Sequence, residues 1–354
     1  MNPAAINVST GPVQISKEVL AALASPSISH RSNGFLHLYC DTTNYLCTQF
    51  NVDRCYILTG SGTAANEAMI FQIKVLGGNG LILSNGEFGE RLVKQATRLS
   101  LPFDELALPW GEQFDIAEME QIVKQREVKW ILFCHCETST GVMNDLNSVV
   151  DVCNRNNCLC FVDCMSTVGT CSIDLSRVAM ATASSGKGLT SIPGLAIIFS
   201  NIEAVLSDQI PVYFDLVHYN KKEGVPYTIS SNLVQALNVA IKQKLQQEQF
   251  ELIDSCSQSC FSLLNERGVL PFNNSRSKVF TISSPGTKTY NIKNQLKKEQ
   301  VVFSCESEYL RSRDWCQVAL FGCYTQSELK YFLKTLQKVS YALLAALSVN
   351  IFCN

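Results

Sequence analysis

Two periods of apolar residues alternate along the first two thirds of the chain. Apolar residues three or four positions apart predict helices over residues 16–24, 34–50, 64–76, 89–99, 116–126 and 146–156. Short apolar runs predict strands over residues 54–58, 80–84, 129–135, 159–163 and 195–200. Strands that alternate with helices indicate an α/β fold with a mainly parallel sheet that is covered on both faces. The last of these strands is expected to run antiparallel, at the edge of the sheet or inside it.

The pattern changes near residue 240. A long amphipathic helix is predicted over residues 242–268. Beyond it the chain has an α+β pattern, with strands over residues 278–283, 301–304 and 316–320 and a helix over residues 326–345. We therefore predict three parts: an N-terminal arm over residues 1–15, a large domain over 16–240, and a small C-terminal domain over 241–354.

Composition and charge limit the classes of function. The chain has 354 residues, 46% of them hydrophobic and 17% charged, which is enough to bury a substantial core. The formal net charge is only −2, so the sequence gives no electrostatic basis for binding nucleic acid or an acidic membrane. The apolar tail over residues 341–352 is shorter than the about 20 residues that span a bilayer. Small-molecule partners are the expectation.

Sixteen cysteines and four histidines raise the question of disulfides or a metal site. The first residues, MNPAAINVST, have no signal-peptide pattern, so we expect a cytoplasmic protein with reduced thiols. Many cysteines lie in apolar segments, where cysteine behaves as a small buried hydrophobic residue. Because no Cys-x2-Cys pair occurs, we predict no metal site.

Residues suited to catalysis follow three of the predicted strands. Ser61, Gly62 and Thr63 follow the first strand, residues 135–141 follow a middle one, and Asp163 ends the next. In an open parallel sheet, ligands bind at the carboxyl ends of the strands. These segments are therefore expected to meet at one site.

Lys187 lies in a turn of small residues, Ser-Ser-Gly-Lys-Gly. A lysine can form a Schiff base with pyridoxal 5′-phosphate, an aspartate can keep the pyridine nitrogen protonated, and a Ser-Gly-Thr turn at a helix start can bind the phosphate. Taken singly, Asp163 equally fits a helix cap and Lys187 fits a solvated loop lysine. Together with the turn at Ser61 they favour a pyridoxal phosphate site.

Five segments carry a family resemblance: TGSGTAANEA (59–68), NGEFGER (85–91), HCETSTGVMN (135–144), FVDCMSTVG (161–169) and SSGKGLTSIPGLAIIFS (184–200). Over roughly residues 8–240 the chain resembles the class V, fold-type I aminotransferases, closest to the branch of 2-aminoethylphosphonate:pyruvate and alanine:glyoxylate (serine:pyruvate) enzymes. The resemblance implies a seven-stranded type of sheet, pyridoxal 5′-phosphate as cofactor and a homodimer with shared active sites.

The resemblance also implies roles for single residues. Lys187 and Asp163 would be catalytic, and Phe88 would stack on the pyridine ring. The phosphate of the neighbouring subunit would be reached by a loop that follows Tyr227. The cofactor contacts implied in this way are Ser61, Gly62, Thr63, Phe88, Thr138, Asp163, Met165, Lys187, Thr228 and Ser231.

The chain departs from the family pattern at one position. Family members that act on amino or keto acids usually carry an arginine where this chain has Gln317, and a neutral amide cannot pair with a carboxylate as a guanidinium does. Arg311 and Arg313, or Arg31, are candidate replacements, although such arginines are more often solvated surface residues.

These observations favour an aminotransferase. It would move an amino group from a small amine or amino acid to a keto acid or aldehyde, with ping-pong kinetics. A lyase, decarboxylase or cyclase on the same scaffold is the alternative, because the usual arginine is Gln317. A non-catalytic binding protein is a third interpretation.

Overall fold

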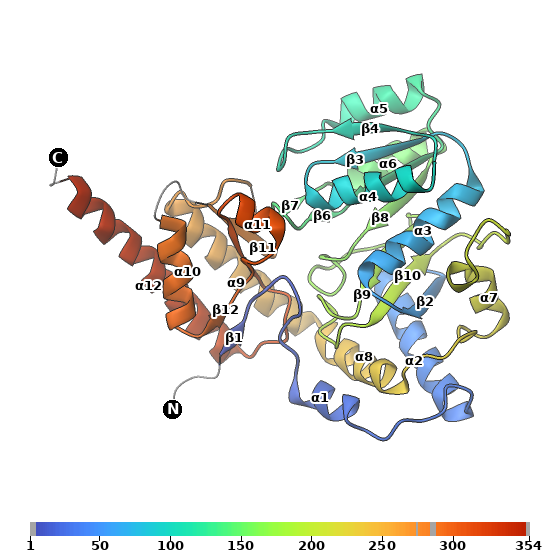
Figure 1. Cartoon of the computed structure of the whole chain (residues 1–354), viewed down its shortest axis with the longest axis horizontal. Coiled ribbons are helices and arrows are strands. Elements are labelled where there is room, and N and C mark those ends of the chain that lie inside the picture. The colour runs from blue at the N-terminus through green and yellow to red at the C-terminus, as the bar shows by residue number, and fades with distance from the viewer. Residues whose placement is uncertain (1–4, 274, 284–287, 352–354) are drawn as a thin grey trace.

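The computed structural model describes residues 5–273, 275–283 and 288–351, with the side chains of residues 288 and 340–351 outside the description. Its larger part is built on a seven-stranded sheet, and its smaller part holds the C-terminal third of the chain together with the N-terminal arm (Figure 1). The α/β prediction is confirmed.

The sheet has the strand order β2-β10-β9-β8-β5-β3-β4. Parallel pairs join β9 to β8, β8 to β5, β5 to β3 and β3 to β4, whereas β10 runs antiparallel to both β9 and β2. The antiparallel strand is therefore inside the sheet and not at its edge. The bounds are β2 Arg54–Thr59, β3 Gly80–Ser84, β4 Phe103–Ala107, β5 Trp130–Cys134, β8 Leu159–Asp163, β9 Met180–Ser184 and β10 Leu195–Ser200.

Alternating residues of the strands supply two cores. Along β5, Ile131 and Phe133 pack toward one face, and Trp130 and Leu132 pack toward the other, because successive strand side chains point to opposite faces. The first face is covered by α2 (Asn33–Phe50), α5 (Ile116–Gln125), α6 (Leu146–Arg155) and α8 (Ser231–Lys244). The second face is covered by α3 (Gly62–Leu76), α4 (Glu87–Arg98) and α7 (Leu216–Lys221).

Within the seven-stranded sheet, the sequence pattern did not predict two strands, β4 and β9. The central strand β9 reads Met-Ala-Thr-Ala-Ser, and its small residues give little hydrophobic signal although its first four are buried. The edge strand β4 reads Phe-Asp-Glu-Leu-Ala, in which only Leu106 is buried. Both strands are thus specified by pairing within the sheet rather than by their own apolar content.

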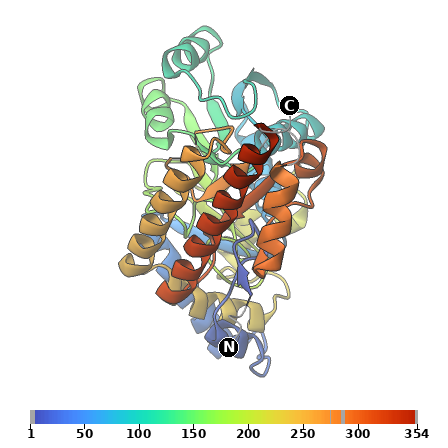
Figure 2. The same ribbon diagram turned by 90° about the vertical axis from the view of Figure 1, so that its left-hand side faces the viewer.

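The smaller part has its own core around two-stranded sheets. Strands β11 (Val279–Ile282) and β13 (Cys316–Ala319) pair antiparallel, and β1 (Ile6–Asn7) of the N-terminal arm pairs parallel with β12 (Val301–Val302). Helices α9 (Gln247–Glu266), α12 (Gln326–Ile351) and α10 (Lys288–Lys298) lie side by side across these strands (Figure 2). Five short elements remain among the described residues: α1 (Lys17–Leu23), α11 (Glu308–Ser312), a 3-10 turn at Val212–Phe214, and the strands β6 (Cys136–Glu137) and β7 (Val142–Met143), which pair antiparallel with each other.

The prediction of one helix over residues 242–268 is wrong. Helix α8 ends at Lys244 and α9 begins at Gln247, so two helices meet at Leu245. Lys244 is fully buried, and its Nζ donates a hydrogen bond of 2.8 Å to the carbonyl oxygen of Gly322. This contact fixes the end of α8 against the smaller part, and the boundary predicted at residue 240 falls inside α8.

The cysteines and the C-terminal helix bear on two further expectations. All fifteen cysteines of the described ranges are free thiols. The same ranges hold no cluster of three metal-ligating side chains and no helix that is both long and apolar enough to cross a bilayer. The helix predicted over residues 326–345 is present as α12, whose backbone continues into the apolar tail as far as Ile351; Phe352 and the side chains of residues 340–351 lie outside the described residues.

Candidate active site

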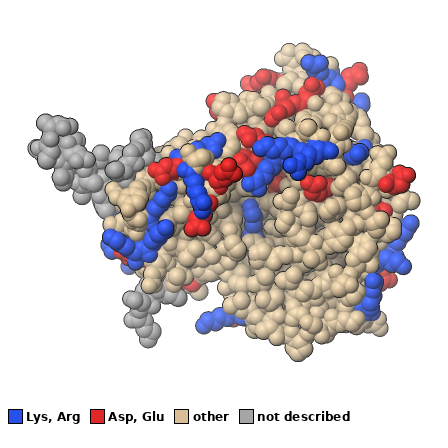
Figure 3. Space-filling view, in the orientation of Figure 1, with Lys and Arg blue, Asp and Glu red and all other residues tan. Residues whose placement is uncertain are grey.

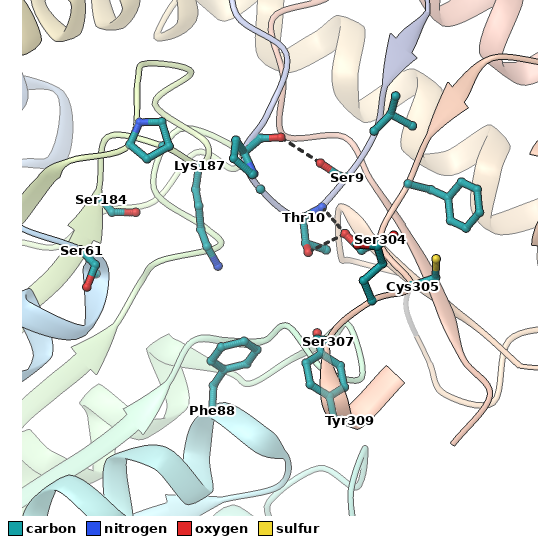
Figure 4. Close-up of a pocket in the computed structure, with 18 of the residues that line it drawn as sticks. Ser9, Thr10, Ser61, Phe88, Ser184, Lys187, Ser304, Cys305, Ser307 and Tyr309 are labelled. Atoms are coloured by element: carbon teal, nitrogen blue, oxygen red, sulfur yellow. Dashed lines mark hydrogen bonds between the residues drawn. The ribbon is translucent and has the colours of Figure 1, made fainter. Parts of the chain in front are cut away.

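Two adjoining cavities open at the carboxyl ends of the strands. The inner one has a volume of about 420 Å³ and contains Asp163, and the outer one has about 850 Å³ and is bounded by the N-terminal arm and by residues 302–309. Gly62, Phe88, Arg91, Ser184 and Lys187 line both cavities. The outer cavity is drawn in Figure 4, where Lys187 and Phe88 extend toward each other opposite Ser304 and Tyr309.

Asp163 ends β8 and is buried at the floor of the inner cavity. One carboxylate oxygen accepts a hydrogen bond from the backbone N–H of Met165 at 2.8 Å, which is the local capping contact expected of a strand-end aspartate. The other accepts from Asn66 Nδ2 on α3 at 2.7 Å. Burial raises the pKa of Asp163, while these two hydrogen bonds and the charge of Lys187 act to lower it. The two hydrogen bonds fix the orientation of the carboxylate on the cavity wall.

Asn66 is a site residue that the sequence reasoning missed. Its side-chain oxygen accepts from Thr182 Oγ1 at 2.6 Å, so β9 orients the amide and the amide orients Asp163. Asn66 follows Ser61 by five residues in the same conspicuous segment, TGSGTAANEA. Its role can be recognised only when it is known which side of α3 faces the end of β8, and the sequence pattern does not give this.

Lys187 lies in the turn that joins β9 to β10. The turn is closed by Ser185, whose Oγ donates to the carbonyl oxygen of Ile192 at 2.6 Å and accepts from Leu195 N–H at 3.1 Å. The Lys187 Nζ lies 3.5 Å from Ser166 Oγ and 5.4 Å from the centroid of the Phe88 ring. Burial lowers the pKa of Lys187, and the carboxylate of Asp163 opposes this effect. The lysine is half-buried, and it lines both cavities.

Phe88 is positioned by a buried carboxylate. Helix α4 has Gly86 as its N-cap, which supplies no side chain, and Glu137 fills this place by accepting from the N–H groups of Phe88 at 3.1 Å and Gly89 at 2.9 Å. A Cβ atom on Gly86 would lie only 2.5 Å from Glu137 Cγ, so the glycine makes room for the carboxylate. Burial raises the pKa of Glu137, and hydrogen bonds from Ser139, Gly89 and Phe88 lower it.

The turn before α3 is suited to an anion. Ser61 is the N-cap residue, yet its side chain makes no capping hydrogen bond, and Ser61 and Thr63 are both exposed. Free N–H groups at a helix start attract a phosphate. A Cβ atom on Gly62 would lie 2.5 Å from Met165 Sδ, so a side chain here would push into the cavity wall.

Thr138 contacts the lysine through an intermediate hydroxyl. Its Oγ1 shares a hydrogen bond with Ser166 Oγ, which in turn accepts from Lys187 Nζ. Ser166 was not singled out from the sequence, although it lies in the segment FVDCMSTVG. The two hydroxyls form a polar wall beside Lys187.

Gln317 does not line either cavity. It is fully buried in β13, and its Nε2 donates to the carbonyl oxygens of Thr138 at 2.6 Å and Ser139 at 3.1 Å and to Thr281 Oγ1 at 2.8 Å. Its Oε1 accepts from Tyr309 OH at 3.0 Å. The amide thereby ties the smaller part of the molecule to the loop that carries Thr138.

The three candidate arginines lie away from both cavities. Arg31 is exposed and donates to the carbonyl oxygens of Val225 and Pro226 at 3.1 and 3.2 Å. Arg313 stacks over Trp110, with 3.8 Å from Cζ to the ring centroid, and Arg311 is exposed on α11. Arg91, which the sequence reasoning did not consider, lines both cavities.

Thr228 and Ser231 lie in the loop before α8 and at the first residue of that helix. Thr228 is exposed, and Ser231 Oγ accepts a hydrogen bond from Ile28 N–H at 3.0 Å. Neither residue lines the two cavities of its own chain.

The residues of the inner cavity fit pyridoxal phosphate. A buried carboxylate, a lysine of lowered pKa, an aromatic ring and an uncapped helix start surround one space of about 420 Å³. Asp163 would hold the pyridine nitrogen, Phe88 the ring face, and Ser61, Gly62 and Thr63 the phosphate.

Comparisons with known proteins point the same way. The family model described as "Aminotransferase class-V" matches residues 14–209. An uncharacterized aminotransferase of Methanocaldococcus jannaschii is 32% identical over 250 residues, 67% of this chain and 65% of its own length. A 2-aminoethylphosphonate–pyruvate transaminase of Pseudomonas aeruginosa is 33% identical over 199 residues, 53% of this chain and 54% of its own. The alignments thus span at most about two thirds of these relatives.

Solved structures share the fold along nearly the whole chain. A ureidoglycine-glyoxylate aminotransferase of Bacillus subtilis superposes with a TM-score of 0.85 at 22% identity, covering 99% of both chains. An aspartate aminotransferase of Thermus thermophilus has a TM-score of 0.83 at 24% identity and covers 96% of this chain and 99% of its own. The likeness extends to the smaller part, where the sequence resemblance is weak, and it supports the fold-type I architecture.

Proposed function

The chain belongs to the class-V aminotransferase family, whose members use pyridoxal phosphate, and we propose that it transfers amino groups by a ping-pong mechanism. One observation carries the proposal. Asp163, Lys187 and the uncapped start of α3 come from three different strand ends and border the same cavity. A buried carboxylate and a lysine whose pKa is lowered by burial, on the wall of one cavity, are typical of catalytic sites.

Each residue has a definite task in this reaction. Bound pyridoxal phosphate supplies an aldehyde that takes up an amino group and a cationic ring that accepts electrons from the substrate carbon. The Asp163 carboxylate keeps the ring nitrogen protonated. Lys187 Nζ, whose lowered pKa favours the neutral amine, accepts the proton of the substrate carbon and returns it. Phe88 fixes the ring plane, and Thr138 and Ser166 orient Lys187 Nζ.

The proposed substrates are small. Relatives are named for 2-aminoethylphosphonate with pyruvate and for L-aspartate with glyoxylate. We assign to this chain a donor that resembles 2-aminoethylphosphonate or alanine and serine, with a keto acid or an aldehyde as acceptor. The outer cavity of about 850 Å³ has room for such molecules beside Lys187.

We also propose a cytoplasmic homodimer with shared sites. Thr228 lies outside its own cavity on an exposed loop, as expected of a residue that serves the neighbouring subunit. Ser231 begins α8 beside this loop. Free thiols at all fifteen described cysteines fit a reducing compartment.

The test uses the purified protein loaded with pyridoxal phosphate. An aminotransferase given a panel of amines, without acceptor, converts the bound cofactor to its pyridoxamine form and stays there. Borohydride reduction followed by peptide mapping labels Lys187, and Lys187→Ala loses turnover and label together. Return of the original spectrum after each amine would instead favour the lyase, decarboxylase or cyclase alternative. That alternative is based on Gln317, a buried neutral residue at the position of the usual arginine. An unlabelled Lys187 would refute the proposal.

A further inference from the structure

A row of cations borders the inner cavity along α4. Arg91, Lys94 and Arg98 are spaced by three and four residues, so they share one face of the helix. All three line the cavity that contains Asp163 and Lys187. Figure 3 shows Lys and Arg atoms gathered over α4 on the face viewed in Figure 1.

The row is not explained by ion pairing. Arg91 pairs with Glu87 at 2.9 Å, but Lys94 and Arg98 form no ion pair within the described part of the chain. Like charges four residues apart on a helix are unfavourable by about 0.2–0.5 kcal/mol per pair. The spacing of Lys94 and Arg98 therefore weakens the isolated helix slightly, and a ligand of opposite charge would offset this cost.

The opposite wall of the cavity leads to the uncapped start of α3. Gln95, between the exposed cations, donates to Glu67 Oε1 at 2.9 Å and to the carbonyl oxygen of Thr63 at 3.5 Å, so it joins α4 to the first turn of α3. Glu67 is the one carboxylate on this wall among the residues that line the cavity, and Gln95 already occupies one of its oxygens. An anion that follows the row thus passes from exposed cations to free helix N–H groups.

We propose that Arg91, Lys94 and Arg98 form an entry site for the dianionic phosphate of the incoming cofactor. The inference rests on the proposed function, because it concerns how pyridoxal phosphate reaches the cavity. Clefts lined by one sign of charge raise association rates by about 10 to 1,000 fold, and the effect falls steeply with ionic strength. The cations would hold the phosphate at the rim before it reaches Ser61, Gly62 and Thr63.

The experiment measures cofactor association with the cofactor-free protein by stopped-flow absorbance at 20 and 300 mM salt. Lys94→Gln/Arg98→Gln is compared with Lys124→Gln/Arg126→Gln, which removes the same charge from exposed cations at the end of α5. Arg91 is left intact because its Cζ lies 4.8 Å from the Phe88 centroid. Pyridoxal, which lacks the phosphate, is the matched ligand.

The α4 double variant should slow association of pyridoxal phosphate by about 3 to 10 fold at low salt. This is at or below the lower end of the range for steering, because Arg91 remains in place. The difference should shrink at 300 mM salt, because screening acts on exposed charges. Pyridoxal should bind all proteins at equal rates, and dissociation of the phosphate form should change less than twofold. The single variants, Lys94→Gln and Arg98→Gln, should each give part of the effect.

Three results would overturn the entry site: an unchanged association rate, an equal loss in the α5 control, or an equal loss for pyridoxal. A change confined to dissociation would also overturn it, since it would place the cations in the final complex. Failure of the unaltered protein to bind the cofactor at all would refute the proposed function instead, so the two outcomes are separable.

Discussion

Replacing Gln317 by leucine tests how the smaller part of the molecule is joined to the loop that carries Thr138. The side chain is fully buried, and its Nε2 donates the hydrogen bond that the carbonyl oxygen of Thr138 accepts. Ser139 O retains the hydrogen bond from Thr281 Oγ1 at 3.1 Å. Tyr309 OH loses its acceptor but lies at the outer cavity, where Ser307 is a second partner. One carbonyl is thus left buried and unpaired.

The expected loss follows from these contacts. A buried orphan carbonyl costs about 1–3 kcal/mol, and each other hydrogen bond that is lost contributes about 0.5–1.5 kcal/mol. With the bonds to Tyr309 and Thr281 included, Gln317→Leu should lower the free energy of unfolding by about 2–6 kcal/mol. Urea denaturation of the cofactor-free protein measures this difference.

Two further variants separate the causes. Gln125→Leu on the exposed side of α5 makes the same chemical change at the surface and should stay within about 0.5 kcal/mol of the unaltered protein. Thr281→Val removes one acceptor of the Gln317 amide and should cost less than Gln317→Leu. A loss below about 1 kcal/mol in Gln317→Leu would contradict the reasoning, because an unpaired buried carbonyl alone costs at least that much.

Three other changes probe the site and its support. Asn66→Leu removes the hydrogen bond to Asp163. It should weaken cofactor binding about tenfold or more, since a hydrogen bond to a charged group is worth about 1.5–3 kcal/mol. Fluorescence titration measures the affinity, with Asn79→Ala as the control, and equal affinities of the two variants would contradict the role of Asn66. Gly62→Ala should weaken binding by crowding Met165 Sδ, and Gly62→Ala/Met165→Ala should restore it; no recovery would show that crowding is not the cause. Burial lowers the pKa of Lys244 to about 7. Between that value and the ordinary lysine pKa of about 10.4 the folded state binds fewer protons than the unfolded state, so stability should rise with pH in this window, and Lys244→Met should flatten the rise; parallel pH profiles would exclude Lys244 as its source.

The α/β fold was predictable because most strands carry their own signal. Residues 81–83 and 159–162 are continuous apolar runs of the kind that a buried parallel strand requires, and the structure has strands over residues 80–84 and 159–163. By contrast, β9 has only small residues after Met180, and the junction between α8 and α9 has no glycine or proline. The strand depends on its neighbours, and the junction depends on the contact of Lys244 with Gly322, neither of which a local pattern reveals.

The site likewise contains residues that the sequence predicted and supporting residues that it did not. The strand ends placed the turn at Ser61–Thr63, residues 135–141 and Asp163 near one another in the prediction. In the structure Thr63, Thr138 and Asp163 line the inner cavity together with Lys187. The supporting residues Asn66 and Glu137 act across elements, through hydrogen bonds whose partners are 97 and 48 residues away in the sequence. Such contacts depend on which side of a helix faces the sheet and on the order of the strands. Residue spacing along the chain therefore does not predict them.

The wall of the outer cavity has a consequence for the order in which the molecule is completed. Thr10 and Ser304, which meet through a hydrogen bond of 3.0 Å, are separated by 294 positions, and β1 finds its partner only at Val301. Everything that surrounds the inner cavity lies between Gly62 and Lys187. The residues around the inner cavity are therefore synthesised long before residues 302–309, which complete the outer cavity. During synthesis the N-terminal arm cannot form its pairing with β12 until residues 301–304 have been synthesised.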